Sequence, residues 1–275
     1  MSTLQEQAAL AANAIVKADG LLITGGAGMG VDSGLPDFRG NEGFWKAYPA
    51  LGDIGMSFME AADPANFESH PKLAWGFYGH RLNLYQSTAP HTGFKLLKAM
   101  GEQCPKGYFV FTSNVDGHYH KSGFSPERII ECHGSINHLQ CSRDCSGKIW
   151  PADDIAIEVD NEQCLCLSEL PLCPNCNALA RPNILMFNDY HWNSARTAAQ
   201  QQRYQKWLSE IENLVVIECG AGTAVPTVRH QGEYQSGTLI RINPREPQCL
   251  KSDSISIQAG ALAALTAINE ALNTI

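Results

Sequence analysis

A short apolar run that passes directly into a glycine-rich segment constrains the fold more than any other feature of this sequence. The run is Leu21 to Thr24, and Gly25-Gly26-Ala27-Gly28-Met29-Gly30 follows it. Before it, Leu4 to Lys17 has the periodicity of an amphipathic helix, which Gly20 ends. A buried strand that enters a tight glycine turn and then a helix opens a nucleotide-binding βαβ unit. We therefore expect a parallel sheet whose ligand lies at the carboxyl ends of its strands.

Three later segments fit the same sheet. Each is apolar, five or six residues long and followed by small or polar residues: Tyr108 to Thr112, Leu214 to Glu218, and Thr238 to Asn243. Such runs are typical of strands that are buried on both faces. A last helix, Ala261 to Leu272, should close the domain. The predicted fold class is α/β, a Rossmann-like parallel sheet with helices on both faces.

Two segments interrupt this rhythm of strands and helices. Residues 41–90 are rich in aromatic side chains and are expected to form a helical lid over the site. Residues 136–180 hold six of the ten cysteines and are expected to form a small zinc-binding insert. The Rossmann-like domain would then be assembled from three parts, residues 1–40, 91–135 and 181–275.

Two cysteine pairs in the insert have the spacing of a metal site. They are Cys141 with Cys145 and Cys173 with Cys176, and 27 residues separate the pairs. Four thiolates suit tetrahedral zinc, and a site without an open position is structural. Cys164-Leu-Cys166 is a rival pair, because a one-residue gap in a strand sends both side chains to the same face. Buried free thiols are the third interpretation.

Composition limits the partners and the compartment. A net charge of −8 argues against direct binding to nucleic acid, which normally needs a basic patch. The first twenty residues lack the basic start and apolar stretch of a secretory signal. The most apolar stretch, Leu214 to Ile217, is too short to cross a membrane. We expect a cytoplasmic protein with no membrane contact, whose cysteines bind metal rather than form disulfides.

Ordered blocks along residues 20–262 resemble the motifs of the sirtuins. The blocks are Gly26-Ala27-Gly28 with Ser33-Gly34-Leu35-Pro36-Asp37-Phe38-Arg39, Thr112-Ser113-Asn114-Val115-Asp116-Gly117, Glu131-Cys132-His133-Gly134-Ser135, the two cysteine pairs, Arg181 to Asp189, Gly220 to Thr223, and Ile242-Asn243. Sirtuins bind NAD, expel nicotinamide, and let the carbonyl oxygen of an acyl-lysine attack the exposed ribose carbon. The resemblance therefore implies an NAD-dependent protein-lysine deacylase that acts on acylated lysine side chains and releases O-acyl-ADP-ribose.

The resemblance also implies roles for particular residues. The amides of Gly26, Ala27 and Gly28 would cradle the pyrophosphate of NAD. Asp37, Phe38 and Arg39 would complete that loop, with Phe38 shielding the ribose from water and Arg39 meeting phosphate and ribose. Ser113, Asn114 and Asp116 would contact the ribose and the carboxamide, Asn114 with a catalytic part. The adenosine half would be held by Gly220, Gly222, Thr223 and Asn243. His133 would be the general base that deprotonates a ribose hydroxyl.

Some of these residues also allow a purely structural role, and some differ from the sirtuin motifs. A lone histidine after a strand is often a satisfied structural residue, and His118 and His120 flank the same site. Ser113 replaces the family's glutamine, and Asn188 stands where a glycine is usual. An ADP-ribosyltransferase, an NAD hydrolase or a non-catalytic NAD-binding module are the alternatives. Acyl-chain preference, target proteins and oligomeric state are not readable from the sequence.

Overall fold

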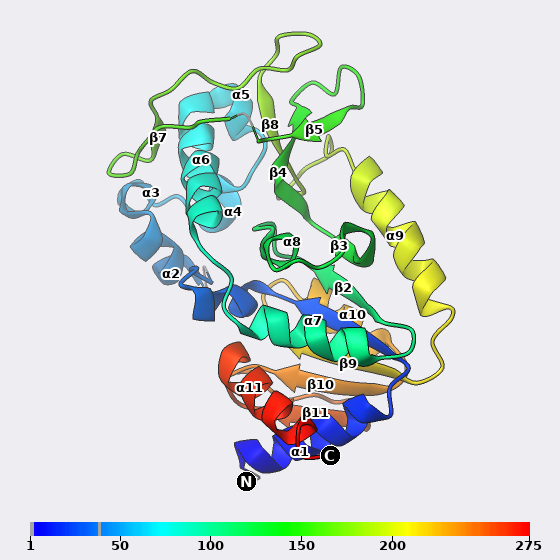
Figure 1. Ribbon diagram of the computed structural model, residues 1–275. Helices are drawn as coiled ribbons and strands as arrows, with labels where there is room; N and C mark the ends of the chain where they lie inside the picture. Colours follow the sequence, from blue (N-terminus) through cyan, green and yellow to red (C-terminus); the bar gives the residue numbers. More distant parts are fainter. Residues whose placement is uncertain (1–2, 38–39, 154) are drawn as a thin grey trace.

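The computed structural model describes residues 3–37, 40–153 and 155–275 and is built around a six-stranded parallel sheet (Figure 1). The strand order is β11-β10-β9-β1-β2-β3. The strands are β1 (Gly20–Gly25), β2 (Tyr108–Thr112), β3 (Ile129–Glu131), β9 (Leu214–Cys219), β10 (Thr238–Ile242) and β11 (Ser254–Ile257). The glycine-loop strand β1 lies in the interior of the sheet, with β9 on one side and β2 on the other.

Helices cover both faces of this sheet because alternate strand residues point to opposite sides. Leu21 and Ile23 belong to a core with α1 (Leu4–Val16), α7 (Gly93–Gln103) and α11 (Ala261–Leu272). Leu22 faces the other way and packs in a second core with α9 (Ala195–Leu208) and α10 (Thr227–Tyr234). The predicted fold class is therefore confirmed.

A second body of the molecule combines the helical segment with the cysteine-rich insert, at the top of Figure 1. Its helices are α2 (Gly40–Ala47), α3 (Pro49–Asp53), α4 (Phe58–Ala61), α5 (Asn66–Ser69) and α6 (Pro71–Ser87). Its sheets are the antiparallel β5 (Ile149–Pro151), β4 (Gly134–Cys141) and β8 (Ala180–Ile184), and the hairpin of β6 (Val159–Asp160) and β7 (Leu165–Cys166). Both segments contribute to one aromatic core, in which Trp75 and Phe77 of α6 are fully buried.

The sequence-based expectations and the structure differ in a few elements. The four expected strands are present, and β3 and β11 were not predicted. The segment after the glycine loop is a short 3₁₀ helix, η1 (Ala27–Ser33), and two further short helices are α8 (His118–Lys121) and η2 (Pro126–Arg128). Within the described ranges, no helix combines the length and apolar character that a bilayer crossing requires.

Candidate active site and metal centre

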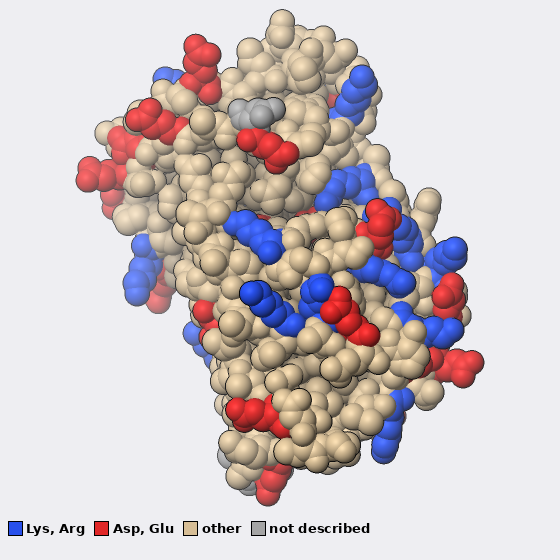
Figure 2. All heavy atoms as spheres, viewed as in Figure 1, with Lys and Arg blue, Asp and Glu red and all other residues tan. Residues whose placement is uncertain are grey.

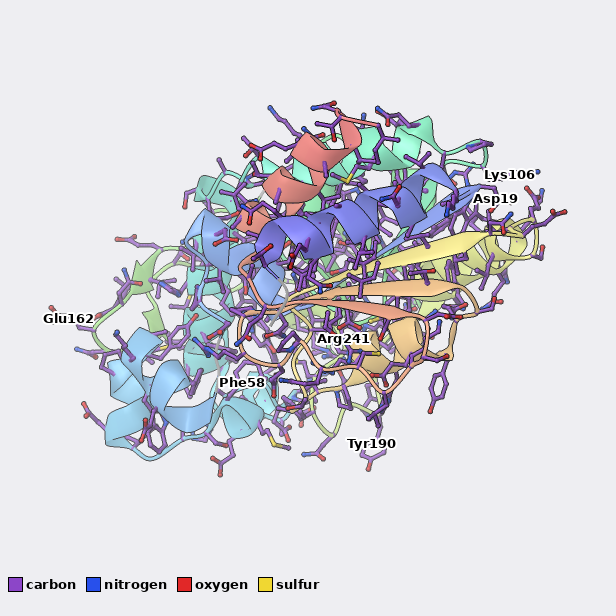
Figure 3. All side chains as sticks on the ribbon, turned by 90° about the horizontal axis from the view of Figure 1, so that it is seen from below. Asp19, Phe58, Lys106, Glu162, Tyr190 and Arg241 are labelled. Carbon is purple, nitrogen blue, oxygen red and sulfur yellow. The ribbon has the colours of Figure 1, made fainter. Side chains whose placement is uncertain are left out.

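The carboxyl ends of β1, β2, β3 and β9 bring most of the predicted site segments together. These ends lead into the glycine loop, the segment of Asn114 and Asp116, the turn of His133, and the turn that begins at Gly220. Asp19 and Lys106, labelled in Figure 3, mark the opposite, amino ends of β1 and β2. Parallel α/β sheets bind their ligands at the carboxyl ends.

The glycine loop after β1 packs backbone against backbone on the turn after β9. A Cβ on Gly26 would lie 2.8 Å from the carbonyl oxygen of Gly220, and one on Gly28 would lie 2.8 Å from its Cα. Gly220 itself has φ 63°, which favours glycine, and a Cβ there would overlap the backbone of Gly28. Glycine is therefore required on both sides of this contact.

The same contact uses two of the three amides that were expected to cradle a phosphate. The amide of Gly26 donates to the carbonyl oxygen of Cys219 (3.0 Å), and that of Gly28 donates to Gly220 (3.0 Å). In this conformation these two amides join two loops, and the phosphate-binding role of the glycine loop stays a prediction. Ala27 is the first residue of η1, and the N–H groups at a helix start have no partner within the helix.

Asn114 is fixed to the glycine loop by its own side chain. Its Nδ2 donates to the carbonyl oxygen of Gly26 (2.9 Å), and its backbone amide donates to Oγ1 of Thr112 (3.0 Å). The amide of Ser113 donates to the carbonyl oxygen of Gly25 (3.2 Å). Asn114 thus lies at the junction of β1 and β2, where a ribose bound along the glycine loop would meet it.

Asp116 is a buried carboxylate beside a buried histidine. Its Oδ1 accepts from the amide of His118 (2.8 Å), and the Asp116 residue is 6% exposed. Burial raises the pKa of Asp116, and the nearby His118 opposes that rise. His118 is 0% exposed and packs edge-on against the ring of Phe94, so it is no surface residue. Burial lowers the pKa of His118.

His133 lies in the two-residue turn between β3 and β4. The turn is held at both ends: the amide of Cys132 donates to Thr112 (2.9 Å), and the amide of Leu185 donates to the carbonyl oxygen of His133 (2.9 Å). Gly134 follows with φ 77°, and a Cβ there would overlap the carbonyl oxygen of Asn183. Burial lowers the pKa of His133, which keeps the imidazole neutral and able to accept a proton.

Asn243 fastens the turn after β9 to the loop after β10. Its Nδ2 donates to the carbonyl oxygen of Ala221 (2.9 Å), while its Oδ1 accepts from the amides of Arg245 (3.0 Å) and Glu246 (2.9 Å). Thr223 donates its hydroxyl to Glu246 (2.7 Å), and Gly222 has open space around it. The side chain of Asn243 therefore joins the turn after β9 to the loop after β10.

Two buried arginines near these loops were not singled out from the sequence. Arg229 donates to the carbonyl oxygens of Ala221, Glu246 and Gln248 at 3.0–3.2 Å. Arg241, labelled in Figure 3, forms a fully buried ion pair with Glu218 of the neighbouring strand. The sequence did contain a signal for the pair of Arg241 and Glu218. Each is a charged residue inside an otherwise apolar strand, and buried charges need partners.

The first loop approaches the loop after β10 at Asp37, whose carboxylate lies 3.9 Å from the guanidinium of Arg245. Phe38 and Arg39, which the sirtuin resemblance places beside the ribose and phosphates, lie outside the described residues.

The segment after β8 is held by a buried, bidentate ion pair. Arg181 donates through both terminal nitrogens to Asp189, at 2.7 and 2.8 Å. Asn188, where the family usually has glycine, has φ 56°, a conformation that asparagine tolerates better than most residues. Its Nδ2 also donates to Asp63 of the helical segment (3.0 Å). The departure from glycine therefore keeps the backbone conformation and adds a contact.

The four expected cysteines converge on one point. Their sulfur atoms all lie within 4.8 Å of one another, with 3.6 Å between Cys141 and Cys176 and between Cys145 and Cys173. A tetrahedral site with Zn–S bonds of about 2.3 Å needs sulfurs about 3.8 Å apart. Asn175 donates to the sulfur of Cys145 (3.3 Å) and, with Cys176, lowers the pKa of that thiol to about 6. The residues fit a closed, structural zinc site.

The rival pair does not take part in this cluster. Cys164 and Cys166 are buried in the aromatic core of the second body, where the backbone of Cys164 lies against Gly76 of α6. Among the described residues, the four-thiol cluster is the metal-binding arrangement that the structure contains.

Comparison with known proteins shows the family and the fold of this chain. The model of the Sir2 family matches residues 26–225. An NAD-dependent protein deacylase of Pyrococcus furiosus is 33% identical over 223 residues, covering 79% of each chain. One of Aquifex aeolicus is 28% identical over 232 residues, covering 82% of this chain and 84% of that protein. A solved Sir2 homolog–NAD complex covers 96% of this chain and 93% of its own, with 21% identity and a TM-score of 0.71, and shows the same fold. The chain belongs to the Sir2 family, the sirtuins.

Proposed function

We propose that this protein is an NAD-dependent protein-lysine deacylase that transfers the acyl group to ADP-ribose and releases nicotinamide. The observation that carries the proposal is the convergence of Asn114, Asp116 and the turn of His133 at the carboxyl ends of β2 and β3, beside the glycine loop. The relatives named NAD-dependent protein deacylase support the same reaction.

NAD would lie across the loop of Gly26 to Gly28, with its adenosine half toward Thr223 and Gly222 and its nicotinamide half toward Asn114 and Asp116. The acyl oxygen of the lysine substrate attacks the ribose carbon as nicotinamide leaves, and this step needs no base. The next step does, because a ribose hydroxyl is a poor nucleophile until a proton leaves it. His133, partly buried and with a lowered pKa, would accept that proton.

The substrates would be acylated lysine side chains of proteins. They would bind between the helical segment and the chain after β8. Figure 2 shows acidic and basic side chains interspersed on the face in view, a surface of the kind that does not favour nucleic-acid backbones. Direct nucleic-acid or membrane binding forms no part of the proposal. We infer a cytoplasmic location, where a reducing environment keeps the four zinc-ligand thiols available.

The test is a pair of assays on His133→Ala. Deacylation of an acetyl-lysine peptide should fall by about 10²-fold or more, the contribution typical of a general base. Exchange of labelled nicotinamide into NAD precedes the base-dependent step and should remain near the wild-type rate. A variant that deacylates like the wild type would remove His133 from the mechanism. A wild type that releases only free ADP-ribose would establish NAD hydrolysis instead.

A further inference from the structure

Helix α9 covers the open edge of β3, the strand that leads into the turn of His133 (Figure 1). Strand β3 pairs with β2 on one side only, so its other edge exposes backbone groups that need partners. Two side chains of α9 supply them at Glu131. Its amide donates to Oε1 of Gln200 (3.0 Å), and its carbonyl oxygen accepts from the hydroxyl of Thr197 (3.1 Å).

The side chain of Glu131 is held by the same helix. It is buried, and its Oε2 forms an ion pair with Arg196 of α9 and lies 3.4 Å from Nε2 of His120. Burial alone would raise the pKa of Glu131, but His120 and Arg196 outweigh burial and hold it below the usual value. Glu131 is therefore ionised and tied to Arg196 across the neutral pH range.

His133 follows Glu131 by two residues, so the position of Glu131 bears directly on the position of the proposed base. The main chain of the turn also forms backbone hydrogen bonds with Thr112 and Leu185, which hold it beside β2 and β8. We propose that Arg196, acting through Glu131, is a positioning residue that sets the placement of the His133 imidazole over the ribose. The proposal rests on the proposed role of His133 as the base.

A cavity beside Arg196 makes the proposal testable by chemical rescue. Its volume is about 420 Å³, and His120, His138, Arg196 and Arg203 are among the residues that line it. Truncation of Arg196 would enlarge this space where the guanidinium lay. A small guanidinium ion could then enter and restore the charge beside Glu131.

The experiment compares Arg196→Ala with a matched control on the same helix and the same cavity. Arg203 pairs with Glu127 on the surface (2.9 Å), and such exposed pairs contribute little. In Arg196→Ala, kcat for deacylation should fall about 10- to 100-fold, the scale of a misplaced catalytic group. The KM for NAD and nicotinamide exchange should change less than about twofold. Millimolar ethylguanidinium should recover much of the lost rate. Arg203→Ala should match the wild type and show no rescue.

Three results would overturn the proposal: wild-type deacylation by Arg196→Ala, an equal loss of deacylation and nicotinamide exchange, or a loss that ethylguanidinium does not restore. If Arg196→Ala is insoluble, Arg196→Lys replaces it, and its kcat should fall while exchange is kept. His133→Ala separates the two levels of inference. An inactive His133→Ala beside a fully active Arg196→Ala would remove the positioning role alone, whereas an active His133→Ala would remove both.

Discussion

At the scale of single residues, burial decides the protonation state of the proposed base. His133 lies in a turn between two strands, and burial lowers the pKa of its imidazole below the usual value of 6.5. A lowered pKa means that the neutral, proton-accepting form persists into mildly acidic solution. Glu131, two residues away, stays ionised because its ion pair with Arg196 and the nearby His120 outweigh the cost of burial.

This environment predicts the acid limb of the pH–rate profile. The kcat for deacylation should be constant near neutral pH and fall only below pH 6.5, as protonation of His133 removes the base. The measurement is kcat with saturating NAD and acetyl-lysine peptide across pH 5 to 8. Nicotinamide exchange, which needs no base, serves as the internal control and should keep a flatter profile. A midpoint above 6.5 would contradict the lowered pKa of this partly buried imidazole.

At the scale of elements, two loops joined backbone to backbone form the floor of the proposed cofactor site. The turn at Gly220 lies against the loop of Gly26 and Gly28, and their amides and carbonyls pair directly. No side chain could stand between them. Glycine serves two purposes here. Its lack of a Cβ lets the two backbones approach closely, and its conformational freedom allows the positive φ of Gly220.

A pair of alanine substitutions on one turn tests this contact. Gly220→Ala should cost about 2 kcal/mol or more, because alanine is strained at φ 63° and its methyl group would overlap Gly28. It should also weaken NAD binding by displacing the glycine loop. Gly222→Ala, two residues on, faces open space and should leave the unfolding temperature nearly unchanged. Thermal unfolding and NAD titration of both variants give the comparison. Equal stability of the two would refute the contact.

The sequence was sufficient for the elements with strong local signals and insufficient for the contacts between them. Apolar runs such as Leu214–Cys219 predicted the interior strands, and paired cysteines predicted the metal cluster. Strand β3 has only three residues and β11 alternates serine with isoleucine, so neither gives a long apolar run. That the amide of Gly26 donates to Cys219 could not be predicted, because those residues are far apart in the chain.

At the scale of the whole molecule, the metal cluster and the proposed base are connected through two paired strands. Strand β4 begins at Gly134, directly after His133, and ends at Cys141, a member of the four-thiol cluster. Its partner β8 starts shortly after Cys176 of the same cluster and runs back to Ile184, next to Leu185, whose amide donates to the carbonyl oxygen of His133. The four-thiol cluster thus lies at one end of the paired strands β4 and β8, and the turn of His133, the proposed base, lies at the other end.

Loss of zinc should therefore affect deacylation more than NAD binding. Cys173→Ser, or treatment of the wild type with a strong chelator, should reduce deacylation at least about tenfold and lower the unfolding temperature, since metal binding at such sites contributes to folding. The proposed NAD site is formed by loops of the six-stranded sheet, so NAD binding should be retained more fully. Metal content, peptide deacylation and NAD titration are to be measured on the same samples. Cys164→Ser, which alters a buried thiol outside the cluster, is the matched control and should keep its zinc. Purified protein with less than about half an equivalent of zinc, or a metal-free protein that deacylates normally, would rule out this coupling.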